Sequence, residues 1–302
     1  MPPEPARPTL TEVSGFGVNP TGLRMYVYRP AQLAERPAIL VALHNCTESG
    51  PLFASGPAAE FVSLADRHGY IMIFPTATRE GSCFDVSSPA SLHHDGDSDP
   101  AGIVSMVRYI QSRYDTSGAF VTGLSSGAIM TNVLLGCHPD VFVAGAAFAG
   151  VPFGGFAGQS ANWSDECAQG RLIRTPRQWG DAVRAAFPGY AGPWPRVQLW
   201  HSTTDDILHY ANHTEAIKQW TDVHAVSTQA VDTAHPRPGW RRTRYGNAGD
   251  TAAVEAISVT GSPHNVLTAG MAPCTIAFFG LADGRHRPDA VTNRSLPSRD
   301  DR

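Results

Sequence analysis

The chain of 302 residues has almost no lysine, little net charge and no long apolar segment. Lys218 is the only lysine among its 23 basic residues, and the formal net charge is -4. A chain without excess positive charge is poorly suited to general nucleic-acid binding, so we expect no nucleic-acid partner. No run of about 18 apolar residues is present, the length that a membrane-spanning helix needs, so we expect no membrane partner.

Cysteine is also scarce, and its spacing excludes the common zinc-binding patterns. None of the five cysteines forms a C-x-x-C pair; they are Cys46, Cys83, Cys137, Cys167 and Cys274. We therefore expect no zinc site, and the odd number leaves at least one thiol free if disulfides form. More generally, we expect no metal and no cofactor.

An EF-hand calcium loop is disfavoured by its sequence pattern. The segment from Asp95 to Asp99 has the Asp-x-Asp-x-Asp spacing of such a loop. However, the sixth position, which is glycine in an EF-hand, is Pro100, and the twelfth, which is glutamate, is Met106. This segment is instead predicted to be a solvated loop in which Asp99 caps a helix with Pro100 at its first position.

The first four residues do not have the composition of a leader sequence. They lack the basic, apolar and cleavable regions of a secretory signal. We therefore expect the protein either to be cytoplasmic or to carry an added methionine in place of a removed leader. A content of 42% hydrophobic and 17% charged residues is typical of a folded globular chain.

The strongest motif is a Gly-x-Ser-x-Gly sequence between a predicted strand and a predicted helix. Gly123, Ser125 and Gly127 follow the apolar residues 119–122 and precede the apolar residues 128–135. The sharp strand-to-helix turn tolerates only glycine two residues before and after the serine. The serine hydroxyl then projects at the edge of the sheet, close to amide donors of the helix N-terminus. The pattern predicts Ser125 as the nucleophile of a serine hydrolase.

Strand-like and helix-like segments alternate along the chain, which predicts a mostly parallel, doubly wound α/β sheet of the α/β-hydrolase type, with helices on both faces. The predicted strands are residues 10–18, 23–28, 38–43, 70–74, 119–122, 141–148, 197–200 and 254–259, and the predicted helices are residues 58–68, 128–135, 212–223, 268–281 and a segment starting at 99. We assign residues 1–282 to a single catalytic domain with an insertion at 151–194 over the active site. Residues 283–302 are predicted to be a disordered tail or linker remnant.

A serine hydroxyl needs a base to accept its proton and a carboxylate to orient that base. In this fold the acid and the histidine follow later strands, in that order along the chain. Asp205 lies just beyond the predicted strand 197–200 and is the first choice for the acid, with Asp206 as the alternative. His264 follows the last predicted strand in a tight turn and is the predicted base. His201 precedes the acid loop, and we interpret it as structural.

The anion formed during ester hydrolysis needs two backbone N–H donors. One is predicted to be the amide of Ser126, directly after the nucleophile. The other is expected from the loop after the third predicted strand. Cys46 is the first choice for this donor, and with a register shifted by one residue the donor would be Asn45 or Thr47. In the insertion, Trp163 is a candidate platform for a sugar or aromatic group, although tryptophans more often serve packing.

With these residues in place, the chain resembles secreted acetylxylan and feruloyl esterases of the polyhydroxybutyrate-depolymerase-like family over about residues 10–282. The resemblance rests on the elbow and on LHNCT (43–47), PDVF (139–142), AGVP (149–152), CAQG (167–170), TPRQWGD (175–181) and IKQWT (217–221). It implies a secreted serine esterase in which Ser125, Asp205 and His264 form the triad, and Cys46 and Ser126 form the oxyanion hole.

Several residues depart from the usual pattern of this family, and they bear on the substrate more than on the reaction. Asn45 stands where the family usually has the glycine of His-Gly-Cys-Thr-Gln, which makes it a candidate substrate-binding residue. A cysteine expected near Gly155 is missing, so the residue matching its usual partner, Cys167, pairs otherwise or stays free. A Cys46–Cys83 disulfide would tie the oxyanion loop to the long loop after residue 74.

The resemblance implies hydrolysis of acetyl or feruloyl esters on xylan through an acyl-enzyme, which is our first hypothesis. The alternative is a depolymerase for a polyester such as polyhydroxybutyrate, so the partner is a polysaccharide or polyester substrate. A third hypothesis is a non-catalytic carbohydrate-binding relative, which the intact order of serine, acid and histidine disfavours. We expect the protein to be a monomer.

Overall fold

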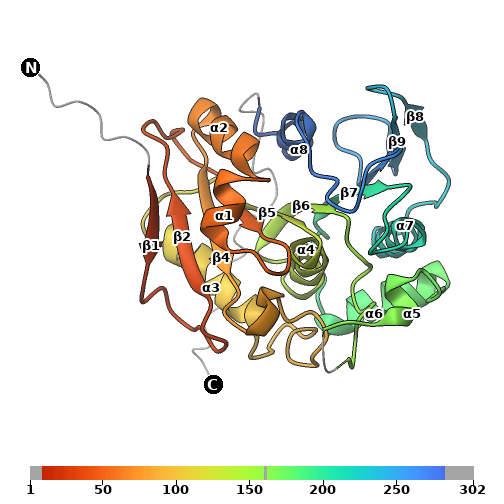
Figure 1. The fold of residues 1–302 in the computed structure, drawn as a ribbon, viewed down its shortest axis with the longest axis horizontal. Helices are drawn as coiled ribbons and strands as arrows, with labels where there is room; N and C mark the ends of the chain where they lie inside the picture. Colours follow the sequence, from red (N-terminus) through yellow and green to blue (C-terminus); the bar gives the residue numbers. More distant parts are fainter. Residues whose placement is uncertain (1–8, 160–161, 283–302) are drawn as a thin grey trace, which may run out of the picture.

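A ten-stranded sheet forms the centre of the molecule (Figure 1). The structure, a computed structural model, describes residues 9–159 and 162–282, and the tail predicted at 283–302 lies outside them. The strand order is β1-β2-β4-β3-β5-β6-β7-β10-β9-β8. The strands are β1 (Leu10–Val13), β2 (Arg24–Tyr28), β3 (Ile39–Leu43), β4 (Ile71–Thr76), β5 (Ala119–Leu124), β6 (Phe142–Phe148), β7 (Arg196–Ser202), β8 (Asp232–Ala234), β9 (Trp240–Tyr245) and β10 (Val254–Val259).

The six neighbouring strands from β4 to β10 in this order are parallel, and antiparallel strands complete both edges. Every residue of β3, β4 and β5 is buried, as expected for parallel strands covered on both faces. Because the carboxyl ends of parallel strands meet at one edge, the loops after β3, β5, β7 and β10 are brought together there.

Helices cover both faces of the sheet (Figure 1). Phe61 and Ile276 belong to one buried apolar cluster, whereas Val107, Val133 and Trp220 belong to another. Burial of these two faces supplies the hydrophobic stabilisation of the fold. The helices are α1 (Gly50–Ser55), α2 (Ala59–His68), α3 (Asp99–Gln111), α4 (Ser126–Cys137), α5 (Asp165–Ala168), α6 (Pro176–Ala186), α7 (Ala211–Val223) and α8 (Met271–Phe279), with a short 3₁₀ segment η1 (Glu80–Ser82).

Most strands and helices lie where the sequence predicts them. The predicted strand 10–18 ends at Val13, since Gly15 and Gly17 have φ angles of 68° and 118°, which an extended strand does not allow. The helices α1, α5 and α6 and the strands β8 and β9 were not predicted. The sequence of β9, WRRTRY, has little apolar content, because an antiparallel strand near the edge of the sheet need not be buried on both faces.

The prediction that Asp99 caps the N-terminus of α3 was wrong. Ser98 occupies the capping position of α3, and Asp99 lies inside its first turn. The Asp99 carboxylate accepts hydrogen bonds from Arg79 at 2.5 and 2.8 Å and from the backbone N–H of Asp85 at 2.7 Å. Asp99 therefore holds the long loop before α3 against this helix.

The insertion at 151–194 contributes α5 and α6 to the structure. A capping box of Thr175 and Gln178 begins α6, and the Trp179 indole N–H donates to Glu215 of α7 at 2.8 Å. The contact joins α6 to α7. The position of the insertion over the active site stays a prediction.

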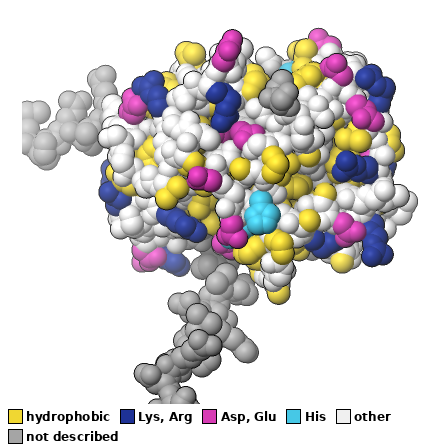
Figure 2. All heavy atoms as spheres, turned by 90° about the horizontal axis from the view of Figure 1, so that it is seen from below, with side chains coloured by type: hydrophobic (Ala, Val, Ile, Leu, Met, Phe, Trp, Pro, Cys, Tyr) yellow, Lys and Arg dark blue, Asp and Glu magenta, His cyan; other side chains and the backbone are white. Residues whose placement is uncertain are grey.

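The surface carries charges of both signs. Figure 2 shows basic, acidic and apolar side chains interspersed over the face that it presents. A mixed surface of this kind does not produce the single-sign field that attracts a polyanion. Within the residues described, no helix combines the length and apolarity needed to cross a membrane.

Candidate active site

Ser125 lies on a strained turn between β5 and α4, as its motif predicts. Its φ and ψ are 55° and -116°, and its N–H donates to the Phe148 carbonyl at 2.9 Å. Close packing requires the two glycines. A Cβ on Gly123 would lie 2.4 Å from the Gly127 carbonyl, and one on Gly127 would lie 2.1 Å from the Leu43 oxygen. The end of β3 is thus packed directly against the elbow.

His264, in the loop after β10, joins Ser125 to Asp205. Its Nε2 lies 2.8 Å from the Ser125 Oγ, and its Nδ1 lies 3.0 and 2.9 Å from the two carboxylate oxygens of Asp205. A carboxylate only accepts hydrogen bonds, so Nδ1 carries the ring proton and Nε2 accepts from the serine hydroxyl. Asp206, the alternative acid, is exposed. The structure therefore brings together the three residues that the sequence singled out.

The Asp205 carboxylate is fully buried and surrounded by donors. It accepts from the backbone N–H groups of Ile207 at 2.9 Å and Leu208 at 2.8 Å, and the His201 Nε2 lies 3.2 Å from its Oδ2. Burial raises the pKa of this carboxyl, but hydrogen bonds from His201 and His264 outweigh the burial and hold the pKa well below its usual value. Asp205 is therefore ionised at every pH at which the protein would work.

His201 contacts the acid, a role that the sequence reasoning missed. Its Nε2 lies between the Leu208 carbonyl at 2.7 Å and Asp205 at 3.2 Å, so it holds both the carboxylate and its loop. The only signal in the sequence was its position four residues before Asp205, which by itself does not distinguish a structural histidine from a positioning one.

Two hydroxyl groups tie the acid loop to the histidine loop. Ser202 and Thr204 both donate to the Ser262 carbonyl, the latter at 2.8 Å. These hydrogen bonds to a backbone carbonyl hold the loops of Asp205 and His264 at a fixed separation. The sequence carried no signal for them, because the partners are about 60 residues apart and one of them is a backbone atom.

The loop after β3 is anchored on both sides of Cys46. His44 is buried, and its ring nitrogens lie 2.7 and 3.1 Å from backbone groups of two loops. Burial lowers the pKa of His44 and favours its neutral form, which can donate at one nitrogen and accept at the other. Thr47, with a φ of 62°, donates its N–H to the Gly81 carbonyl at 2.8 Å.

A second loop connects the two predicted oxyanion positions. The Cys46–Cys83 disulfide that the sequence suggested is present. The next residue, Phe84, donates its N–H to the Ser126 Oγ at 2.9 Å. The same short segment therefore binds the loop of Cys46 and the first residue of α4.

Three cysteines outside this disulfide are free: Cys137, Cys167 and Cys274. Cys167 is buried, and a Cβ placed on Gly155 would lie 2.8 Å from its sulfur. The position of the cysteine that this chain lacks is thus adjacent to the unpaired thiol. Of the two outcomes left open for Cys167, the structure has the free one.

Asn45 and Trp163 are held by local contacts. The Asn45 amide donates to the Cys46 carbonyl at 3.2 Å, and its Oδ1 is buried without a partner in residues 9–159 and 162–282. The indole of Trp163 is 40% exposed and donates to Asp165 at 2.7 Å, with its ring 5.5 Å from that of Phe156. Their role in substrate binding stays a prediction.

Together these groups form a set suited to acyl transfer. A hydroxyl lies within hydrogen-bonding distance of an imidazole nitrogen, and a buried carboxylate orients the ring. The N-terminus of α4 begins directly after the hydroxyl-bearing residue, where backbone N–H groups and the helix dipole favour a developing negative charge.

Known proteins with similar sequences point to one family. The profile described as Esterase PHB depolymerase matches residues 23–222. Feruloyl esterase B of Talaromyces stipitatus is 42% identical over 282 residues, which cover 91% of this chain and 77% of that protein. Acetylxylan esterase of Coprinopsis cinerea is 41% identical over 288 residues, which cover 93% of this chain and 76% of that protein.

Solved structures confirm the fold class. The acetyl xylan esterase from Aspergillus awamori matches with a TM-score of 0.84 and 36% identity, over 91% of this chain and all of that one. The protein TT1662 from Thermus thermophilus, at 16% identity, matches with a TM-score of 0.54 over 92% of this chain and 100% of that one, which bears on the fold alone. The predicted α/β-hydrolase fold is thereby confirmed.

Proposed function

This chain belongs to the Esterase PHB depolymerase family and is a carboxylic ester hydrolase, and from that premise we propose that it hydrolyses acetyl or feruloyl esters on xylan. The relatives named acetylxylan esterase and feruloyl esterase B support this substrate class. The observation that carries the catalytic part is the hydrogen-bonded series from the Ser125 hydroxyl through His264 to Asp205.

In the first half of the proposed reaction, the Nε2 of His264 takes the proton of Ser125 as its Oγ attacks the ester carbonyl. The tetrahedral anion accepts hydrogen bonds from the backbone N–H groups of Cys46 and Ser126. The ionised Asp205 stabilises the imidazolium and keeps its orientation. His264 then protonates the leaving alcohol oxygen, which leaves an acyl-enzyme on Ser125.

In the second half, water takes the place of the alcohol. His264 accepts a proton from this water as its oxygen attacks the acyl carbonyl, and the same two N–H donors hold the second anion. The proton then returns to the Ser125 oxygen when the carboxylic acid leaves. The serine ends the cycle unchanged, and no cofactor is needed in this scheme.

Asn45 and Trp163 are the proposed substrate-binding residues. Asn45 is next to the proposed oxyanion donor, and rotation of its partly buried side chain would turn Oδ1, which has no partner among the described residues, toward a sugar hydroxyl. The exposed part of the Trp163 indole offers an apolar face for a sugar or aromatic ring. We expect Trp163→Ala to raise KM for acetylated xylan while leaving KM for p-nitrophenyl acetate nearly unchanged. Equal KM values for xylan in both proteins would remove Trp163 from the site.

We also propose that the protein works outside the cell. The Cys46–Cys83 disulfide supports this, since such bonds persist mainly in oxidising compartments. The polymeric substrate class proposed above is consistent with the same location.

Turnover of p-nitrophenyl acetate by wild type and Ser125→Ala tests the catalytic proposal. We expect kcat/KM to fall by on the order of 10⁵, because removal of the nucleophile leaves only the binding and oxyanion contributions. Equal rates would instead support a non-catalytic carbohydrate-binding protein. Full activity in His264→Ala would show that another histidine is the base.

The substrate class is tested by comparing acetylated xylan, methyl ferulate and a film of polyhydroxybutyrate. We expect release of acetate or ferulate and little release of hydroxybutyrate. Release of hydroxybutyrate alone would overturn the xylan proposal and leave the esterase mechanism standing, with a polyester as the substrate.

A further inference from the structure

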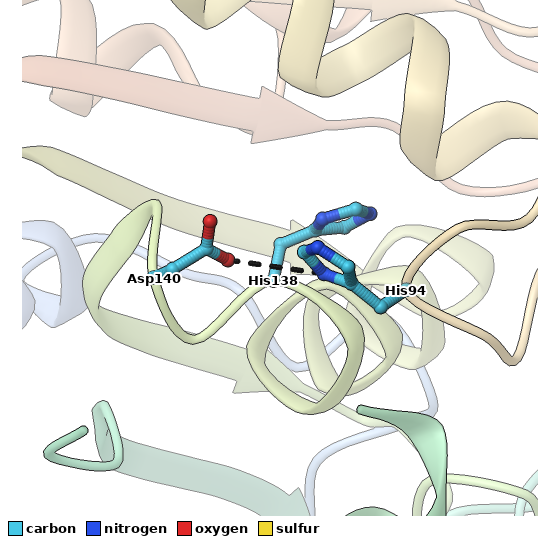
Figure 3. A group of neighbouring side chains, drawn as sticks. All are labelled: His94, His138 and Asp140. Carbon is cyan, nitrogen blue, oxygen red and sulfur yellow. Dashed lines mark ion pairs between the residues drawn. The ribbon is translucent and has the colours of Figure 1, made fainter. Parts of the chain in front are cut away.

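His94, His138 and Asp140 lie together beyond the C-terminal end of α4 (Figure 3). The helix has 12 residues. Its length is therefore about 18 Å, which separates the group from the proposed active site. The atoms that the three side chains offer as metal ligands all lie within 4.8 Å of one another. His94 comes from the loop before α3, His138 ends α4, and Asp140 lies in the turn before β6.

His138 is the unusual member of this group. It is 5% exposed, and neither of its ring nitrogens has a hydrogen-bond partner among the residues that the structure describes. Its backbone, in contrast, is fully used: its N–H donates to Leu134, and its carbonyl accepts from Val141 and Phe142. A buried polar group without a partner costs about 1–3 kcal/mol, so such a group points to a ligand that satisfies it.

His94 is held in place before any ligand arrives. Its ring stacks on Phe187 with centroids 3.6 Å apart and planes within 7° of parallel, and its Nδ1 lies 2.7 Å from the Cys137 carbonyl. A hydrogen bond from one ring nitrogen to a backbone carbonyl is the arrangement that usually orients metal-binding histidines. The other nitrogen, Nε2, lies 3.9 Å from the exposed carboxylate of Asp95.

We propose that His94, His138 and Asp140 bind one divalent transition-metal ion, for which zinc is the reference. Two imidazoles and a carboxylate are ligands that zinc prefers over calcium or magnesium, which take oxygen ligands. Water or Asp95 completes the coordination. The final carbonyl groups of α4 add a favourable partial negative charge.

The ligand atoms need only a small movement to reach a common ion. Zinc–nitrogen and zinc–oxygen bonds of about 2.0–2.2 Å place neighbouring ligands roughly 3.3 Å apart. The atoms offered as ligands lie within 4.8 Å of one another, and the Asp140 side chain is 38% exposed. Rotation of this exposed side chain would bring its carboxylate toward the two imidazoles, with Nε2 of His94 as the ligand and Nδ1 still bonded to the Cys137 carbonyl.

The charges around the group favour an ion at neutral pH. Asp95 and Asp140 supply negative charge, whereas Arg108 is a cationic neighbour that acts against it. No side chain among the described residues competes with an ion for the ring nitrogens of His138, because neither nitrogen has a hydrogen-bond partner there.

The bound ion would fix the loop that carries His94 to the end of α4. The same loop carries the Cys46–Cys83 disulfide near its beginning. Its backbone is already joined to α6 by the His94 N–H, which donates to the Ala186 carbonyl at 2.8 Å. The ion would act as a structural cross-link at the second end of this loop, with no part in the ester chemistry.

The test uses the untagged full chain, freed of metal with a chelator that is then dialysed away. We expect calorimetry to find one zinc ion per chain and saturating zinc to raise Tm by roughly 5 °C. Cobalt should give the visible absorption band of a four-coordinate site, and calcium and magnesium should leave Tm unchanged. Absence of a zinc-dependent Tm shift and of the cobalt band in wild type would overturn the proposal.

Variants assign the ion to these residues. His94→Gln and Asp140→Asn should each weaken zinc binding by at least about tenfold, and His138→Gln should abolish it. Far-ultraviolet circular dichroism and the metal-free Tm show that each variant is folded; if His138→Gln fails this check, the other two variants decide. The control is His235→Gln, at an exposed histidine in the segment between β8 and β9. Wild-type affinity in both His94→Gln and Asp140→Asn would show that the zinc is adventitious and overturn the assignment.

Discussion

A histidine lies near each end of α4, and the two imidazole rings differ in their hydrogen bonds. At its beginning, His264 has both ring nitrogens hydrogen-bonded, one to Ser125 at 2.8 Å and one to Asp205 at 2.9 Å. At its end, His138 is more deeply buried, yet no residue that the structure describes bonds to its ring. A ring with an acceptor on one side and a hydroxyl on the other suits proton transfer, whereas a ring without partners suits coordination. The partners of a histidine, more than its burial, indicate its chemistry.

The backbone at the two ends of α4 favours charges of opposite sign. Ser125, just before the helix, has a φ of 55°, and the helix begins with free N–H groups that favour negative charge. His138, just after it, has a φ of -128° and follows carbonyl groups that favour positive charge. One helix therefore supports an anion at the proposed active site and a cation at the proposed metal site.

We expect the largest effect from Asp205→Asn, which changes the proposed acid near the beginning of α4. Asparagine keeps an oxygen for the N–H groups of Ile207 and Leu208, so the loop should stay folded. The neutral amide lacks the negative charge of a carboxylate, so it neither fixes the tautomer of His264 nor stabilises its imidazolium. We therefore expect kcat/KM for p-nitrophenyl acetate to fall by about 10⁴. Steady-state kinetics at neutral pH measures the change.

The matched control is Asp206→Asn. This neighbour is exposed, and its replacement removes the same charge from the same loop. We expect activity within about twofold of wild type, because surface substitutions away from special contacts have small effects. A large loss in Asp206→Asn with little loss in Asp205→Asn would reverse the assignment of the acid.

Removing the Cys46–Cys83 disulfide should disturb the catalytic end to an intermediate degree. The bond closes a loop with a sequence separation of 37 residues. On the chain-entropy estimate, its loss in Cys46→Ala/Cys83→Ala costs about 4 kcal/mol of the free energy of unfolding. Urea denaturation checks this figure, and a fall in kcat of about 10²-fold would follow if the loop no longer presents the Cys46 amide.

Cys274→Ala is the control for thiol removal. This residue is free and half-buried, so its replacement should change the free energy of unfolding far less than the double variant does. If the two variants were equally stable, the disulfide would have no stabilising part in the loop at the beginning of α4.

The difference between the two ends also explains what the sequence could predict. Ser125 lies in a local motif whose glycines are required by contacts of 2.1 to 2.4 Å, and such constraints are visible in five consecutive residues. Asp205 and His264 follow buried parallel strands, whose apolar runs are equally visible. The order of strands and helices along the chain and the grouping of these three residues could therefore be predicted from local patterns.

Other contacts could not be predicted, because they join loops that the sequence does not relate. His94 and His138 are 44 residues apart and follow no shared motif, so their proximity depends on how the long loop packs on α4. His201 was interpreted as structural because nothing in the sequence shows its contact of 3.2 Å with Asp205. The strand β9, second from the edge of the sheet, was missed because WRRTRY has the composition of a loop.

The final prediction concerns the pH dependence of stability at the far end of α4, with chelator present. Burial lowers the pKa of His138 from 6.5 to about 3, so below pH 6.5 the unfolded chain binds a proton that the folded chain excludes. The free energy of unfolding should therefore fall by about 1.4 kcal/mol per pH unit for this group as the pH decreases from about 6.5 towards 3. Replacement by a residue that does not titrate should remove that contribution.

Urea titrations of wild type and His138→Gln between pH 4 and 7 measure this contribution. His213 of α7, whose pKa burial also lowers to about 3, contributes a slope of the same sign, so the variant should retain part of the dependence. His235→Gln should keep the full wild-type slope, since that side chain is exposed. An unchanged slope in His138→Gln would mean that the folded protein does protonate this ring, and the contrast with His264 at the other end of the helix would then be lost.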